Sequence, residues 1–278
     1  MATRAGVQTS ALVVDTFREA SARKIIWGFF ACSTVLILFF LLIVKIDVVQ
    51  GALATMTIFG KTQRTQDLAQ VVRGAHAAIA GLLYGFGMLL AILASAGLIP
   101  TIFEPGRIEL LLSKPIERWH ILLGRYLGNL LVIALNIFYP VLSLWIIFGV
   151  KTGVWTAGFL WGSVLTLFMF AVYLSVILLV GVVWESAVVA TMVTFGMIIL
   201  SIILYNKTTI ERLLSSEWSR DIVRGLYYLL PKVVDIGQIL GRIVQEKPIE
   251  SWMPLWSTAL FGMACLGSGL WLFQRRNF

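Results

Sequence analysis

The residues that could perform chemistry in this chain are few, and their spacing does not suit an active site. The segment Phe59-Gly60-Lys61-Thr62 matches the end of a phosphate-binding loop, in which backbone amides cradle a phosphate and the lysine pairs with it. Thr55 stands where such a loop needs its first glycine, and no strand of a soluble α/β domain is expected before the segment. The match is attributed to chance, so this chain is not expected to bind ATP by that route.

Histidines and cysteines do not form a recognisable site either. His76 and His120 have no Cys, Asp or Glu at the spacing that a metal site needs. Cys32 and Cys265 both fall in apolar stretches, where a small buried thiol is expected rather than a disulfide. No Ser/His/Asp or Cys/His arrangement stands out, so we predict no catalytic and no metal-binding residue.

The composition indicates that the solvent of this protein is a bilayer. The chain has 278 residues, of which 59% are hydrophobic and only 13% charged, with a mean hydropathy of +0.91. Spanning a bilayer takes about 20 mainly apolar residues in a helix. Six stretches qualify: residues 25–44, 77–99, 127–148, 154–183, 187–204 and 254–273.

These apolar stretches are continuous and do not alternate, so helices must satisfy the backbone. The prediction is an all-α membrane protein with one domain, residues 1–278, built as a six-helix transmembrane bundle. Residues 1–24 precede it as a loosely amphipathic segment with Val7, Ala11, Val14 and Phe17, which predicts a helix on the membrane surface. A frayed polar tail is the alternative, and a cleaved targeting peptide is not expected.

Charge favours an orientation and gives no support for a nucleic-acid-binding protein. Six spans place both termini on one side, whose segments hold ten Lys and Arg residues, whereas seven of the twelve on the other side lie in the long segment 205–253. Because the positive-inside rule applies to short loops, the termini are predicted inside. The net charge of +8 suits anionic lipid headgroups, and nothing resembles a nucleic-acid module.

The centres of the six stretches contain no Asp, Glu, Lys, Arg or His. A carrier driven by protons or sodium usually keeps such a residue near the middle of the membrane. An ion-coupled carrier is therefore the weaker alternative, and the energy for any work is expected to enter from elsewhere. Substrate-binding residues remain unknown, since a lining of Leu, Val, Ile, Phe and Tyr suits a lipid, an amphiphile or a peptide.

The loop between the second and third stretches, residues 100–126, is delimited by prolines. Pro100 ends the second stretch, Pro105 suits the first turn of a helix, and Pro115 disfavours helix just before it. This spacing predicts a short helix over roughly residues 105–113. A second helix should start near Pro115 and run directly into the third span.

The short helix has one face that could dock on a partner. Ile108, Leu111 and Leu112 fall on that face at helical spacing, and Glu104 and Glu109 add carboxylates near them. A force on this helix would be transmitted to the two membrane helices that flank it.

At these residues the chain resembles the permease subunits of ABC-2-type ATP-binding-cassette transporters. Their loop between the second and third spans follows the pattern E-x-G-x-x-E-x-L-L-x-x-P-x-x-R, read here as Glu104, Gly106, Glu109, Leu111, Leu112, Pro115 and Arg118. Pro105 and Arg107 depart from the commoner choices at their positions. In that family the loop carries the coupling helix, which sits in a groove of a cytoplasmic ATPase subunit.

The resemblance implies a transport function without chemistry in this chain. The implied ATPase-coupling residues are Glu104, Gly106, Ile108, Glu109, Leu111, Leu112, Pro115 and Arg118. ATP and Mg would bind the separate ATPase, a second permease copy would complete the pathway as a homodimer or with a related permease, and export is the expected direction. The implied location is the prokaryotic cytoplasmic membrane, with loop 100–126 and both termini cytoplasmic and residues 205–253 outside. An alternative use is a complex that relays force to an extracytoplasmic protein or assists the maturation of a metalloenzyme.

Residues 205–253 contain two amphipathic stretches, 222–230 and 234–243, separated by Pro231. Short helices that dip into the membrane and helices that lie on its surface suit this pattern equally. The pairs Gly81/Gly85, Gly124/Gly128 and Gly158/Gly162 would allow helices to approach closely, without indicating which ones.

Overall fold

A computed structural model describes residues 13–19, 24–42, 45–49, 53–58, 61–65, 68–95, 118–214 and 216–276. Of residues 24–26, of the three strands and of residue 118, it describes the backbone alone. After a helix at residues 13–19, the helices are α2 (Lys24–Leu42), α3 (Leu68–Leu82), the π-helix η1 (Leu83–Gly87), α4 (Met88–Ser95), α6 (Arg118–Thr152), α7 (Ala157–Trp184), α8 (Ala187–Tyr205), α9 (Lys207–Leu213), α10 (Glu217–Leu229), α11 (Val233–Val244) and α12 (Met253–Arg275).

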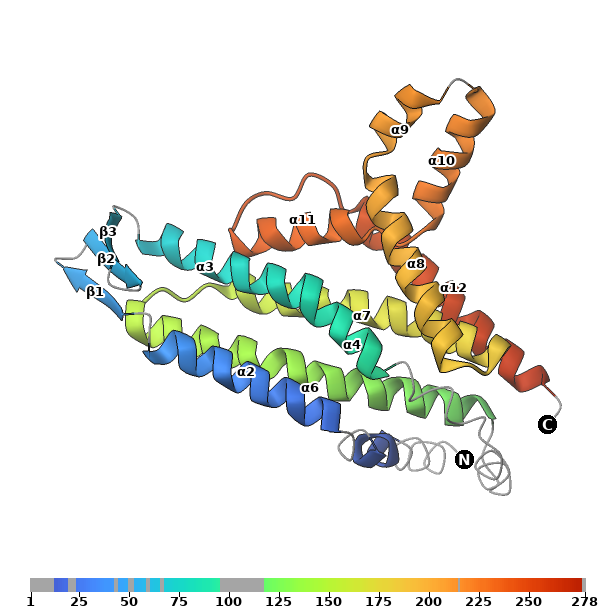
Figure 1. Cartoon of the computed structure of the whole chain (residues 1–278), viewed down its shortest axis with the longest axis horizontal. Helices are drawn as coiled ribbons and strands as arrows, with labels where there is room; N and C mark the ends of the chain where they lie inside the picture. Colours follow the sequence, from blue (N-terminus) through green and yellow to red (C-terminus); the bar gives the residue numbers. More distant parts are fainter. Residues whose placement is uncertain are drawn as a thin grey trace.

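The helical membrane body is confirmed, whereas the count of six spans is not. Within the described residues, five helical stretches are long and apolar enough to cross a bilayer: Leu68–Ser95, Trp119–Thr152, Ala157–Trp184, Ala187–Tyr205 and Met253–Arg275. The predicted first span corresponds to α2, a helix of 19 residues that is apolar from Ile25 onward. Its fully described part, Trp27–Leu42, is shorter than these five. α2, α6 and α7 run side by side, whereas α8 and α12 are inclined to them (Figure 1).

Two ends of this bundle are used below as reference points (Figure 1). We call one the loop end, defined by the helix termini Ser95, Arg118, Trp184 and Arg275. We call the other the sheet end, defined by the termini Leu68, Thr152 and Ala157.

The helix predicted over residues 77–99 begins nine residues earlier, at Leu68. Arg73 and His76 lower the hydropathy of its first turns, which is why the sequence placed the start too late. In the structure His76 lies on the buried face of α3, and Arg73 forms an ion pair with Glu246 at 2.8 Å. A polar side chain with a partner is compatible with a membrane helix.

The third predicted span is part of one continuous helix. α6 covers 35 residues from Arg118 to Thr152, with Pro140 inside it. The prediction that the helix after Pro115 runs directly into the span is therefore confirmed from residue 118 onward. Because α6 is continuous, a displacement of its first turn would be transmitted along the helix to the sheet end.

A three-stranded sheet occupies the segment between α2 and α3, where no element was predicted. β1 (Lys45–Val49), β2 (Leu53–Ile58) and β3 (Lys61–Thr65) pair as an antiparallel meander in the order β1-β2-β3. A strand thus does precede Lys61, contrary to expectation. Lys61 itself opens an antiparallel strand, whereas a phosphate-binding loop leads into a helix, so the loop reading still fails.

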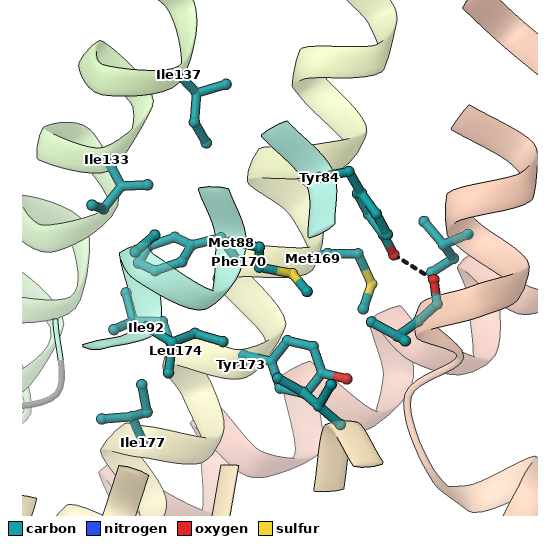
Figure 2. Close-up of a cluster of buried hydrophobic side chains, with 14 of the residues drawn as sticks. Tyr84, Met88, Ile92, Ile133, Ile137, Met169, Phe170, Tyr173, Leu174 and Ile177 are labelled. Carbon is teal, nitrogen blue, oxygen red and sulfur yellow. Dashed lines mark hydrogen bonds between the residues drawn. The ribbon is translucent and has the colours of Figure 1, made fainter. Parts of the chain in front are cut away.

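Helix α7 forms the centre of the bundle. It is apolar on all sides and packs against α3, α4, α6, α8, α11 and α12, which matches the rule that an evenly hydrophobic helix is buried. Figure 2 shows Phe170, Leu174 and Ile177 of α7 among side chains of α4 and α6. In the same view the Tyr84 hydroxyl donates a 2.6 Å hydrogen bond to the carbonyl of Val233, which ties η1 to the first residue of α11.

Only part of the predicted glycine contacts is realised. At Gly158 a Cβ would lie 2.2 Å from the carbonyl oxygen of Ile243, and at Gly162 it would lie 3.0 Å from Val244, so this pair admits the end of α11. Gly81 and Gly85 have nothing within 4 Å of such a Cβ. The pair Gly158/Gly162 therefore allows close approach of two helices, whereas the pair Gly81/Gly85 does not.

Segment 205–253 divides into two parts that differ in how they pack against the bundle. α9 and α10 form a hairpin that projects from the bundle and contains no buried residue (Figure 1). α11 instead packs against α3, α7 and α8 and buries Ile236, Ile239 and Leu240. The second amphipathic stretch is thus inserted into the bundle, while the first is not.

Candidate coupling site

The predicted coupling residues fall largely outside the described part of the chain. Glu104, Gly106, Ile108, Glu109, Leu111, Leu112 and Pro115 lie outside the described residues, and Arg118 is known only as the first residue of α6. What the structure describes is where the loop is attached: α4 leads into it at Ser95, and α6 leaves it at residue 118. The contacts of these two attachment points show what a movement of the loop would act on.

A buried hydrogen bond joins the two attachment helices. The Ser95 hydroxyl, in the last residue of α4, donates to Asn129 Oδ1 of α6 at 2.9 Å, and neither residue is accessible to solvent. A hydrogen bond between neutral groups in a water-free interior is stronger than one in water, and breaking it leaves two buried polar groups. The end of α4 and the fourth turn of α6, which contains Asn129, are therefore expected to move together.

An ion pair attaches the N-terminal helix to α6. The guanidinium of Arg125 is 1% exposed and contacts the carboxylates of Glu19, through Nη1, and Asp15, through Nη2 at 3.5 Å. Thr16 is buried between these two residues and packs on Gly128, where a Cβ would lie 2.6 Å from the Thr16 Cβ. Residues 13–19 are thus held on α6 by two charges and one close contact.

This cluster was missed in the sequence, although a signal for it exists. Asp15 and Glu19 are spaced i and i+4, so they share one face of a helix. They are the only acidic residues in the first 24, a segment otherwise basic and apolar. Two carboxylates on one face next to an apolar stretch predict a cationic partner in a neighbouring helix.

Tyr126 continues the connection from α6 to α7. Its hydroxyl donates to the carbonyl of Ala171 at 3.0 Å, and the Ser175 hydroxyl donates to the Tyr126 oxygen at 3.3 Å. The start of α6 therefore contacts three elements: the N-terminal helix through Arg125, α7 through Tyr126 and α4 through Asn129. We call these three residues the α6 hub.

The loop end also contains the turn between α7 and α8. Glu185 ends α7 in a left-handed conformation, with φ of 51°, and its carboxylate pairs with Arg276 Nη2 at 2.5 Å. Arg276 Nη1 also donates to the carbonyl of Val182. The end of α12 is thereby fixed to the end of α7.

Both histidines are buried and packed against neighbouring side chains. His76 Nδ1 lies 2.7 Å from the hydroxyl of Thr156, and its ring stacks on Phe159 with centroids 4.2 Å apart. His120 is buried against the ring of Trp119. Among the described residues no group of three or more His, Cys, Asp or Glu is placed to hold a metal ion.

The two cysteines are free thiols. Cys265 is buried, as expected, and burial is the environment predicted for both. Cys32 is exposed on α2, so that part of the prediction is wrong.

A buried cation lies where the segment 205–253 enters the bundle. Lys232, at the N-terminal end of α11, is 2% exposed and donates to the Ser257 hydroxyl at 2.7 Å. Burial lowers the pKa of Lys232. Next to it, burial followed by the nearby charge of Asp235 raises the pKa of Tyr227 to about 12. Tyr227 donates a 3.2 Å hydrogen bond to Asp235, so this junction is polar although the predicted span centres carry no charge.

Comparison with known proteins places the chain in a family. Residues 15–278 match the family described as ABC-2 family transporter protein, which covers nearly all of the chain and includes the loop between α4 and α6. No curated protein matches the chain. Transporters of this family work with a cytoplasmic ATPase subunit. The match, together with five apolar helices long enough to cross a bilayer, shows that this chain belongs to the ABC-2 family of transporters and is a multi-pass membrane protein.

Proposed function

We propose that this chain is the membrane permease subunit of an ABC exporter, and that loop 100–126 receives force from a separate cytoplasmic ATPase. In this proposal α2 serves as the sixth span, a second permease copy completes the pathway, and ATP with Mg binds only the ATPase. The termini and the loop end face the cytoplasm. The chain moves substrate and contributes no catalytic residue.

The observation that carries the proposal is the α6 hub. Arg125, Tyr126 and Asn129 lie in the first four turns of α6, and each contacts a different neighbouring element. A push on the loop that precedes residue 118 would therefore act at once on α4, α7 and the N-terminal helix. Family membership supplies the source of that push, because ABC-2 transporters work with an ATPase.

Co-purification with the ATPase tests the proposal. The double variant Glu109→Ala and Leu112→Asp removes a carboxylate and places a charge on the predicted docking face, so it should release the ATPase subunit. A matched control is Glu217→Ala with Leu213→Asp, in the projecting hairpin, where Leu213 is 80% exposed. The control should retain the ATPase, and equal retention by both variants would contradict the proposal.

Relay of force to an extracytoplasmic protein is the second candidate. The hairpin of α9 and α10 favours it, since it projects from the bundle and exposes Leu213, Trp218 and Leu229 (Figure 1). Deleting residues 207–229 and joining the ends should then abolish the cellular activity while leaving ATPase binding intact. If transport of a substrate persists in the deletion variant, this candidate is wrong.

A further inference from the structure

A hollow lies between the last turns of α7 and α12, at the loop end. It has a volume of about 340 Å³ and is lined by Val182, Val183, Leu272, Arg275 and Arg276. This volume falls within the ~300–1,000 Å³ typical of ligand sites. Three of the lining side chains are apolar and two are cationic, which is the pattern of a site for an amphiphile.

The two arginines of the hollow differ in their electrostatic state. Arg276 is neutralised by Glu185 and bonded to the carbonyl of Val182. Arg275 lies over the ring of Trp271, with its guanidinium carbon 4.2 Å from the ring centroid. Among the described residues no carboxylate forms an ion pair with Arg275, and a cation–π contact leaves the guanidinium N–H groups available to an anion. Within the described part of the chain, the hollow therefore has one positive charge at its rim that no carboxylate pairs with.

The hollow lies at the level of the lipid headgroups along the membrane normal. α12 has 23 residues, which span about 35 Å, slightly more than the ~30 Å of a hydrocarbon core. Its last turn therefore reaches the interface, where aromatic residues such as Trp271 are common. Trp271 is 50% exposed, as expected for a ring at that boundary.

We propose that this hollow binds one anionic phospholipid of the surrounding leaflet. Arg275 would hold the headgroup phosphate, and Val183 and Leu272 would contact the start of an acyl chain. Both apolar side chains are exposed, at 43% and 36%, so a chain can reach them from the bilayer. Basic pockets between membrane helices are known to select anionic headgroups. A soluble anion would leave the apolar lining uncovered, so the lipid is the occupant that fits both parts.

Native mass spectrometry of the purified chain tests this proposal. Phosphatidylglycerol and phosphatidylcholine are added back at equal concentration to delipidated protein in mild detergent. The wild type should prefer the anionic lipid, and Arg275→Gln should weaken that preference about tenfold, the factor expected for the loss of one charge-assisted hydrogen bond. Val183→Trp, which fills the hollow and keeps the charge, should weaken binding of the same lipid.

Arg212→Gln is the matched control, because it removes one exposed arginine from the projecting hairpin. It should bind phosphatidylglycerol as the wild type does. An unchanged preference in Arg275→Gln, unchanged binding in Val183→Trp, or full competition by inorganic phosphate would each overturn the proposal. The measurement needs no ATPase and no transport, so its failure leaves the proposed coupling function untouched.

Discussion

The charges that join Arg125 to Asp15 and Glu19 of the N-terminal helix are buried unequally, and this inequality sets the cost of removing each one. Arg125 is 1% exposed, whereas the side chains of Glu19 and Asp15 are 19% and 60% exposed. Removing Glu19 leaves a buried guanidinium whose remaining partner among the described residues is Asp15, at 3.5 Å. Removing Arg125 leaves two carboxylates that water can still reach.

Glu19→Gln should therefore destabilise the chain by about 3 kcal/mol or more, because it leaves a buried charge uncompensated. Arg125→Met should cost less, about 1–3 kcal/mol. The double variant should be more stable than Glu19→Gln alone. Thermal unfolding in detergent measures all three, with Arg212→Met as the exposed control, and a double variant less stable than Glu19→Gln would contradict this account.

Tyr227 gives a pH prediction outside the membrane-spanning segments. Its pKa is raised to about 12 by burial and by Asp235, above the ordinary value of 10. A raised pKa in the folded state stabilises it below pH 10, and this contribution is lost as the pH rises from 10 towards 12. The absorbance titration of phenolate should therefore lose a component near pH 12 in Tyr227→Phe. If that component persists, the environment described for Tyr227 is wrong.

At the scale of elements, α11 is held in the bundle by contact with the start of α7. A Cβ at Gly158 would lie 2.2 Å from the backbone oxygen of Ile243. Gly158→Ala should therefore displace α11 and destabilise the chain by about 1–3 kcal/mol. Gly81→Ala is the matched control, because nothing lies within 4 Å and alanine should stabilise the helix by about 0.5–1 kcal/mol. Melting temperatures that shift in the same direction for both variants would refute this difference.

The sequence predicted those elements whose signal is hydrophobic length. α7, α8 and α12 match the predicted stretches 154–183, 187–204 and 254–273 to within a few residues. The start of α3 was missed because Arg73 depends on Glu246, a partner 173 positions away that no local pattern indicates. The sheet was missed because its strands are short and pair only with one another.

Of the candidate site, the sequence could predict the loop but not what the loop acts on. Prolines and an amphipathic face are local signals, so residues 105–113 could be singled out. The ion pair of Arg125 and the hydrogen bond between Ser95 and Asn129 arise from packing between helices, which one sequence does not encode in a readable form. The insertion of α11 was left open for the same reason, since an amphipathic helix suits both a membrane surface and a bundle.

For the whole molecule, the proposal fixes which end faces which side. The loop end holds the end of α12, whereas the hairpin of α9 and α10 follows the opposite end of α8, at Tyr205. With Cys32 and Cys265 replaced by serine, a membrane-impermeant maleimide applied to intact cells should label Leu213→Cys. It should label Gln274→Cys only after the membrane is permeabilised. The reverse labelling pattern would contradict the proposed orientation, because it would place the loop end outside the cell.

The central claim is that the loop between α4 and α6 meets the ATPase, and a photo-crosslinking amino acid tests it most directly. Placed at Ile108, the probe should form an adduct with a protein that mass spectrometry identifies by its phosphate-binding loop as an ABC ATPase. Placed at Leu213, in the projecting hairpin, the same probe should form none. An ATPase adduct from Leu213 with none from Ile108 would contradict the account.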